Sequence, residues 1–236
     1  MRLDLFIFNK YNLKSRTYAS ELIKKGQVKV NGEVVTKSSI DVDETFDILI
    51  DNQDNFASQG AYKLKKAIED FNIDVKDKVC ADFGCSNGGF TDILLRNGAK
   101  YVYAYDVGDC ALDPKLLNTN KVEFIKCNLR YLEETEKVDF LCCDVSFISV
   151  KLIIPSIYKI LKVDGEGVIL IKPQFEAGQK YLNKNGIVTD KNIHKKVILD
   201  VLNCLKENNL DPINKTTSPI YYEDKNVEYL VYFKKN

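Results

Sequence analysis

The stretch 78-KVCADFGCSNGGF-90 decides the fold, because an apolar run there leads directly into a glycine-rich turn. Residues 78–83 have the composition of a buried strand, and residues 88–98, which follow the turn, have the pattern of a helix. A glycine turn between a strand and a helix lets a ligand approach the backbone, and the helix N-terminus offers free N–H groups to it. The stretch therefore predicts a nucleotide-type binding turn in an α/β domain.

An acidic residue follows this turn at a spacing typical of nucleotide-binding domains. Asp106 ends the next predicted strand, 101–106, and lies 22 residues after Gly84. A carboxylate there can accept both hydroxyls of a ribose, so the pattern predicts a cofactor that contains a nucleoside. These residues alone leave NAD and S-adenosylmethionine open. The spacing Gly-x-Ser-x-Gly-Gly, in place of Gly-x-Gly-x-x-Gly, favours S-adenosylmethionine.

Strands and helices alternate along the chain from residue 78. The predicted strands are 78–83, 101–106, 122–127, 138–144 and 167–172, with helices at 88–98, 112–118, 149–162 and 190–208. This alternation predicts a parallel sheet with helices on both faces. Residues 215–235 read as two strands joined by a short polar turn, which is typical of methyltransferases. We therefore expect an α/β, Rossmann-like domain whose mostly parallel sheet closes with an antiparallel hairpin.

The N-terminal residues form a different pattern, which predicts a small α+β domain. A helix begins near residues 2–4, and a second begins at Ser15 and ends at Gly26. The stretch 27-QVKVNGEVV-35 alternates around an Asn-Gly pair, the strongest short signal for a hairpin, and a last strand is expected at 45–50. We place this domain at residues 1–50, a polar linker at 51–60 and the larger domain at 61–236.

Composition excludes several classes of protein. The 236 residues carry no net charge, but residues 1–37 hold eight Lys or Arg against three Asp or Glu. Seven cysteines without a Cys-x-x-Cys pair, together with one histidine, do not match zinc-site spacings, so we predict no metal site. No apolar run approaches the ~20 residues of a membrane helix, and there is no secretion signal. We expect a cytoplasmic protein with reduced thiols.

Charged residues at the ends of predicted strands are candidates for catalysis. Asp144 and Lys172 follow apolar strands, and ligands of open α/β sheets bind at this edge. Each has a plainer interpretation: Asp144 could cap a helix and Lys172 could simply reach solvent. Lys63, in the first turn of a predicted helix, and Glu228, within the last strand, are by pattern alone more readily surface charges. The single histidine, His194, is assigned to packing or the surface.

Several stretches together resemble a known family. They are 82-DFGCSNGGFTDILLRNGA-99, 104-AYDVG-108, 112-LDPKL-116, 143-CDVSFIS-149, 170-LIKPQFEAG-178 and 226-NVEYL-230. They resemble the TlyA group of FtsJ-like ribosomal RNA 2′-O-methyltransferases. The stretches 2-RLD-4, 15-SRTYASELIKKGQVKVNG-32 and 36-TK-37 resemble the RNA-binding module of ribosomal protein S4. The resemblance covers nearly the whole chain.

The resemblance implies a function and a set of site residues. It implies methylation of a ribose 2′-hydroxyl, of a cytidine in ribosomal RNA or a ribosomal subunit, with S-adenosylmethionine as cofactor. We also predict no membrane partner and no protein partner. The implied catalytic tetrad is Lys63, Asp144, Lys172 and Glu228. The cofactor contacts would be Asp82, Gly84, Ser86, Gly88, Gly89, Phe90, Asp106 and Asn128. One departure is Gln59, where the family usually has arginine; Lys65 and Lys66 are candidate replacements for binding RNA phosphate.

The roles of these residues follow from the chemistry of the reaction. A 2′-hydroxyl must lose its proton as it attacks, so we assign Lys172 as the base and Asp144 as the group that orients it. Lys63 and Glu228 would position the ribose. In the N-terminal domain, RNA phosphates would be contacted by Arg2, Lys14, Arg16, Lys24, Lys25 and Lys29. The alternatives are an RNA-binding protein with an inactive methyltransferase domain, a hemolysin, as the family label suggests, and an NAD-dependent oxidoreductase.

Overall fold

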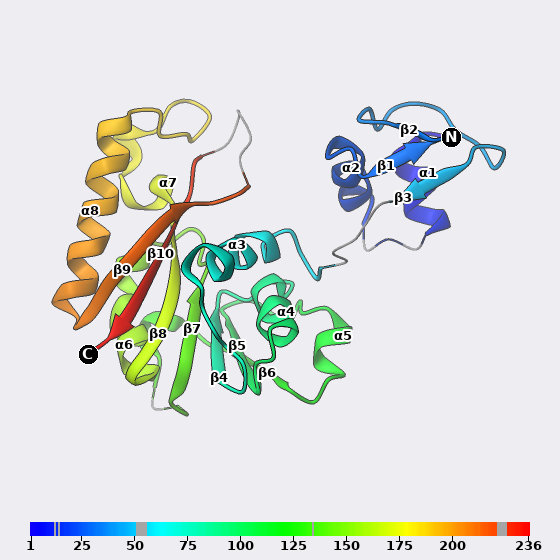
Figure 1. Ribbon diagram of the computed structural model, residues 1–236. Helices are drawn as coiled ribbons and strands as arrows, with labels where there is room; N and C mark the ends of the chain where they lie inside the picture. The colour runs from blue at the N-terminus through cyan, green and yellow to red at the C-terminus, as the bar shows by residue number, and fades with distance from the viewer. Residues whose placement is uncertain (12, 14, 51–55, 134, 221–225) are drawn as a thin grey trace. The chain divides into compact units, whose positions relative to one another are not determined.

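The computed structural model describes residues 1–236 with the exception of 12, 14, 51–55, 134 and 221–225. The chain divides into two compact units, Met1–Asn55 and Phe56–Asn236 (Figure 1). Of the predicted linker 51–60, residues 51–55 lie outside the described residues and residues 56–60 belong to the second unit. Phe56 and Ala57 are buried there, against the core of the larger domain.

The N-terminal unit has the predicted α+β architecture. Its elements are α1 (Leu3–Lys10), α2 (Arg16–Lys24), β1 (Val28–Val30), β2 (Glu33–Val34) and β3 (Ile48–Ile50). The Ser15 hydroxyl accepts a hydrogen bond from the backbone N–H of Tyr18 and so begins α2. Asn31 and Gly32 both have positive φ, as the tight turn between β1 and β2 requires. The sheet is antiparallel, in the order β2-β1-β3.

The second unit is built on a seven-stranded sheet in the order β6-β5-β4-β7-β8-β10-β9. Strands β4 to β8 pair in parallel, and β10 runs antiparallel to both of its neighbours. The bounds are β4 (Val79–Phe83), β5 (Tyr101–Asp106), β6 (Val122–Lys126), β7 (Val138–Cys143), β8 (Leu161–Ile171), β9 (Leu210–Thr217) and β10 (Tyr229–Lys235). The predicted fold class, including the closing antiparallel hairpin, is confirmed.

Helices cover both faces of this sheet (Figure 1). On one face α6 (Ile154–Ile160) and α8 (Lys191–Glu207) pack against Leu141 and Cys143 of β7. On the other, α3 (Ala61–Phe71) and α4 (Gly89–Arg96) pack against Phe140 and Cys142 of the same strand. Successive side chains of a strand point to opposite faces, so a strand buried on both sides must be apolar at every position. This explains the uninterrupted apolar runs of the sequence.

Several boundaries differ from those predicted. The helix expected at 149–162 is split into a 3-10 helix, Val150–Leu152, and α6, because Pro155 lacks an N–H and fits only the first turn of a helix. Strand β9 begins at Leu210 rather than 215, and Pro212 is tolerated within it because β9 lies at the sheet edge. The connection to β10 is longer than the expected short turn, and residues 221–225 of it lie outside the described residues. The helices α5 (Pro114–Leu117) and α7 (Pro173–Glu176) and the 3-10 helices Leu129–Tyr131 and Gln179–Tyr181 complete the unit.

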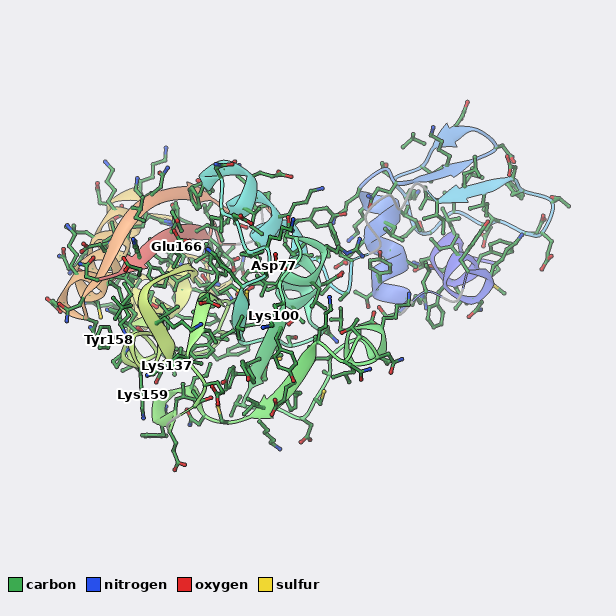
Figure 2. The ribbon with its side chains drawn as sticks, turned by 60° about the horizontal axis from the view of Figure 1, so that its bottom comes forward. Asp77, Lys100, Lys137, Tyr158, Lys159 and Glu166 are labelled. Carbon is green, nitrogen blue, oxygen red and sulfur yellow. The ribbon has the colours of Figure 1, made fainter. Side chains whose placement is uncertain are left out.

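The amino ends of the parallel strands carry charged side chains that stabilise the fold. Several of these residues, among them Lys137, Lys159 and Glu166, are labelled in Figure 2. Lys78 forms an ion pair of 3.0 Å with Glu166, and the Lys159 ammonium donates to the Leu132 carbonyl at 2.8 Å. Lys137 donates to the carbonyl of Lys159. These charges are used in ion pairs and backbone contacts at the end of the sheet away from the predicted catalytic residues.

Candidate active site

The four predicted catalytic residues lie together at the carboxyl ends of β7 and β8. Asp144 follows β7, and Lys172 follows its parallel neighbour β8. Strand β10 starts antiparallel beside the end of β8, which brings Glu228, the residue before β10, to the same edge. Lys63 reaches it from the first turn of α3. The topology thus assembles side chains that are up to 165 positions apart in the sequence.

Three ion pairs join these side chains into one network. The Lys172 Nζ lies 2.5 Å from Asp144 Oδ1, and the Lys63 Nζ lies 3.1 Å from Asp144 Oδ2. Lys63 also lies 2.8 Å from Glu228 Oε2. Lys172 also donates to the hydroxyl of Ser146 at 2.7 Å.

The electrostatics of the network keep two of its members charged. Burial alone would lower the pKa of Lys63, but the carboxylates of Asp144 and Glu228 outweigh it, and the pKa is raised. Burial alone would raise the pKa of Asp144, but the charges of Lys63 and Lys172 outweigh it, and the pKa is lowered. At neutral pH Lys63 is therefore a cation and Asp144 an anion.

The plainer interpretations of these four residues do not match the structure. Asp144 caps no helix, because the 3-10 helix that follows is capped by the hydroxyl of Ser149. The Lys172 side chain is 8% exposed, so it does not extend into solvent. The side chains of Lys63 and Glu228 are only 12% and 16% exposed. Charges that are so nearly buried require partners, and here each partner is another member of the network.

A pocket of about 860 Å³ lies beside the network and extends to the glycine turn. Gly84, Ser86, Asp106 and Asn128, four of the eight predicted cofactor contacts, line it, and so do Asp144 and Ser146. Its volume is within the ~300–1,000 Å³ range of small-molecule sites. The pocket therefore joins four of the predicted cofactor residues to one predicted catalytic residue, Asp144, in one continuous space.

The residues of this pocket fit a nucleoside cofactor. Asp106 accepts hydrogen bonds from the N–H groups of Ser86 at 2.9 Å and Gly108 at 3.1 Å, which fix the carboxylate at the end of β5. A carboxylate has about four acceptor sites, so it keeps capacity for two ribose hydroxyls. Val107, Leu129 and Ile148 supply apolar walls, and apolar walls with few polar groups are typical of cofactor sites.

The other four predicted cofactor contacts do not line this pocket, and each packs within the fold. Asp82 is fully buried, and its carboxylate accepts from the N–H and the hydroxyl of Thr91, which holds the start of α4 to β4. Its burial raises its pKa to about 7. A Cβ on Gly88 would lie 2.4 Å from Leu116, and one on Gly89 would lie 2.1 Å from the hydroxyl of Ser58. Phe90 is a core residue.

Gly84 is needed for a reason that the sequence does not reveal. Its φ is +83°, and an added Cβ would lie 2.8 Å from the backbone oxygen of Asp144. A side chain at this position would push the glycine turn away from the end of β7. Gly84 therefore fixes the distance between the turn and Asp144, besides lining the pocket.

Sequence reasoning did not assign roles to Ser146, Phe147 and Phe175, all of which line the pocket. Phe147 is 92% exposed, and its φ of +64° is unusual for a bulky residue. Its ring centroid lies 5.3 Å from that of Phe175. An aromatic ring held in a strained, exposed position at the mouth of a pocket indicates a contact with a ligand. The Asp-Val-Ser-Phe sequence after β7 was the available signal.

Glu176 holds the loop that carries these residues. Its carboxylate accepts from the Ser149 hydroxyl at 2.6 Å and from the Val150 N–H at 2.7 Å. Glu176 ends α7, the short helix that starts directly after Lys172. It therefore ties the segment after Asp144 to the segment after Lys172 and fixes both sides of the site.

The predicted RNA contacts of the N-terminal unit fall into two groups. Arg2 and Arg16 both bind the buried Asp4, at 3.0 and 3.1 Å, and the hydrogen bond from Arg2 is the main cause that lowers the Asp4 pKa to about 2. These two cations stabilise the fold of the unit. Lys24, Lys25 and Lys29 are exposed, and Lys14 lies outside the described residues. Of the proposed substitutes for the family arginine, Lys66 pairs with Asp70 at 2.8 Å.

Comparisons with known proteins agree with this geometry. Residues 56–235 match the FtsJ-like methyltransferase family, and residues 1–47 match the S4 domain. Hemolysin A of Brachyspira hyodysenteriae is 38% identical over 99% of both chains. The 16S/23S rRNA (cytidine-2′-O)-methyltransferase TlyA of Mycobacterium tuberculosis is 33% identical over 99% of this chain and 89% of its own. A solved structure labelled hemolysin, from Streptococcus thermophilus, superposes with a TM-score of 0.78, at 36% identity over 100% of this chain and 88% of the other. The chain belongs to the FtsJ-like methyltransferase family, in the TlyA group, and has an S4 domain before its methyltransferase domain.

Proposed function

We propose that this protein transfers a methyl group from S-adenosylmethionine to the 2′-hydroxyl of a cytidine in ribosomal RNA. The observation that carries the proposal is the shared pocket. Asp106 and Ser86 line it, and so do Asp144 and Ser146. A cofactor bound by the first pair would direct its far end to the second. We take the target, a cytidine in ribosomal RNA, from the name of the TlyA relative. A cytoplasmic location is part of the same proposal.

The network of charges suits the removal of a proton from a hydroxyl. S-adenosylmethionine, when bound, supplies a methyl group that its sulfonium already activates. Lys63, held between two carboxylates, stays charged and orients Asp144. Lys172 contacts one carboxylate and one hydroxyl. In its neutral form, after its own proton has left to solvent, it would accept the proton of the 2′-hydroxyl at Nζ as the methyl group is transferred. Asp144 then stabilises the ammonium that forms.

The alternatives receive less support. An inactive methyltransferase domain would have no reason to keep three ion pairs in a nearly buried network beside an open pocket. An NAD-dependent oxidoreductase is disfavoured because the family match spans residues 56–235. No helix in the described part of the chain is long and apolar enough to cross a membrane.

The direct test is to map 2′-O-methylation on ribosomal RNA. Subunits from a strain without this protein would be incubated with the purified chain and S-adenosylmethionine. We expect one or a few cytidines to gain a methyl group, and no transfer when the cofactor is left out. Absence of new methylation on both subunits and on naked ribosomal RNA would contradict the proposal.

Phe147 should contact the base of the target nucleotide, since its exposed ring lines the same pocket as Asp144. Base stacking on an aromatic side chain contributes ~1–3 kcal/mol, so Phe147→Ala should raise the KM for RNA by about 10- to 100-fold. The affinity for S-adenosylmethionine should not change by more than about twofold. Val163→Ala, at a 71% exposed position in β8, is the control. An unchanged KM for Phe147→Ala would exclude the stacking role.

The exposed lysines of the N-terminal unit should bind RNA phosphates. Lys24→Glu together with Lys29→Glu should weaken RNA binding about tenfold and lower the slope of log Kd against log salt concentration by about two. Arg2 and Arg16 are left intact, because they support Asp4. Lys100→Glu with Lys121→Glu, in the methyltransferase domain, is the matched control. Equal loss of affinity in both double variants would indicate only a general charge effect.

A further inference from the structure

A second pocket, of about 760 Å³, lies along α8 between that helix, strand β9 and residues 187–189. We call it the α8 pocket. Its floor is apolar, with Ile198, Leu199 and Leu202 of α8 and Val188 of the preceding loop. Three lysines, Lys191, Lys195 and Lys215, complete the lining. None of these residues takes part in the proposed methyl transfer.

The α8 pocket shares a chain segment with the catalytic network. Val227 and Tyr229 line it, while the residue between them, Glu228, points its carboxylate to Lys63. Residues 227–229 therefore contribute two side chains to the α8 pocket and one to the catalytic network. Successive side chains of an extended chain point to opposite faces, so the α8 pocket and the predicted ribose site lie on opposite faces of residues 227–229, at the edge of the sheet that carries Lys172.

His194 makes the wall of the α8 pocket rigid. The ring is only 8% exposed, with Nδ1 at 2.9 Å from the hydroxyl of Tyr229 and Nε2 at 2.7 Å from the carbonyl of Val188. One ring thus fixes two walls of the pocket, from β10 and from the loop before α8. A wall fixed in this way is preformed for a ligand, which then loses little free energy to ordering on binding.

The lining is positively charged and apolar at once. Lys191, Lys195 and Lys215 are exposed, and among the described residues no acidic side chain lines the pocket. A ligand that fits this lining has a negative charge beside a flat or compact apolar group. A nucleotide has both. The pocket volume also suits a single nucleotide better than a protein partner, since stable protein interfaces bury ~800 Å² on each side over a largely flat face.

We propose that the α8 pocket binds a nucleotide of the substrate RNA other than the one that is methylated. This inference rests on the proposed function, because the RNA that enters the catalytic network from one side of Glu228 would extend to the pocket on the other side. The base would lie on the apolar floor formed by Ile198 and Leu199. The phosphates would contact Lys195 and Lys215, as lysines bind phosphate in other RNA complexes.

Filling the pocket tests the proposal without removing a charge. Leu199 is 57% exposed, so Leu199→Trp should fold normally while it occupies the floor. We expect the Kd for unmethylated ribosomal subunits to rise about tenfold, with the affinity for S-adenosylmethionine unchanged. Ile213→Trp is the matched control, since Ile213 is 54% exposed on β9 and does not line the pocket.

Charge reversal tests the phosphate contacts separately. Lys195→Glu with Lys215→Glu should weaken binding of the subunits and lower the slope of log Kd against log salt concentration by about two. Lys206→Glu, in the last turn of the same helix, should leave the slope nearly unchanged, because Lys206 does not line the pocket. A slope that falls equally for Lys206→Glu would count against the pocket.

A photo-crosslinking side chain at position 199 gives a direct readout. We expect crosslinks from position 199 to ribosomal RNA, at a nucleotide different from the methylated one, and none from position 213. If the wild type methylates RNA but the pocket variants bind it with unchanged affinity and position 199 crosslinks to protein alone, the α8 pocket proposal is overturned and the proposed function stands. If the wild type neither binds nor methylates RNA, both are overturned.

Discussion

Replacement of Lys172 with alanine should lower the rate of methyl transfer by about 1,000-fold, within the range that general base catalysis contributes. The side chain contacts Asp144 and Ser146, so its removal takes away the proposed proton acceptor, while Asp144 keeps its ion pair with Lys63. Single-turnover methylation of ribosomal RNA measures this step. The Kd for S-adenosylmethionine should stay within about threefold of the wild type, because Lys172 does not line the cofactor pocket.

The variant Lys172→Arg distinguishes between two roles of Lys172, that of a base and that of a fixed positive charge. Arginine keeps the ion pair with Asp144 but cannot release its proton near neutral pH. We therefore expect it to be as inactive as the alanine variant. An arginine variant with near-normal turnover would show that the site needs only a cation there, and the assignment of Lys172 as base would be wrong.

The turns and the helix cap could be predicted from the sequence, because each depends on a few adjacent residues. The Asn31-Gly32 hairpin, the capping Ser15 and the glycine turn at 84–89 each follow from a few adjacent residues, and the structure has all three. The alternation of apolar strands and helices predicted the sheet, because strands that are buried on both faces appear in the sequence as nearly continuous apolar runs. The prediction started β9 at residue 215, whereas the strand begins at Leu210 and includes Pro212, which is allowed there because β9 is an edge strand.

The composition of the site was harder to predict than its position. Gly88, Gly89 and Asp82 belong to the same stretch as Gly84, but the structure uses them in contacts with Leu116, Ser58 and Thr91, which no local pattern contains. Phe147 reads as one more apolar residue in the sequence, and its exposure depends on a backbone angle that only the folded chain has. The α8 pocket depends on β9, β10 and α8 together, so no single segment indicates it.

Replacement of Asp144 with asparagine should have the largest combined effect on activity and stability. Among the described residues, Asp144 is the only carboxylate that contacts both lysines of the network, and its loss leaves Lys172 with the hydroxyl of Ser146 there. Removal of one partner from a nearly buried ion pair costs about 3 kcal/mol, so we expect a fall of that size in the free energy of unfolding at pH 7. Methyl transfer should fall by at least about 100-fold, since Lys172 loses the group that orients it.

The pH dependence of this loss identifies its cause. The pKa of Asp144 is lowered from 3.8 in the folded chain, so its charge stabilises the fold above that value and is lost as pH falls through the folded pKa. Urea unfolding of wild type and Asp144→Asn should therefore differ at pH 7 and converge as the pH falls below 3.8. Asp164→Asn, at a 76% exposed carboxylate that pairs with Lys234, should cost less than about 1 kcal/mol. If the difference in the free energy of unfolding between wild type and Asp144→Asn stays constant down to the lowest pH, the loss of stability comes from altered packing and not from the lost charge.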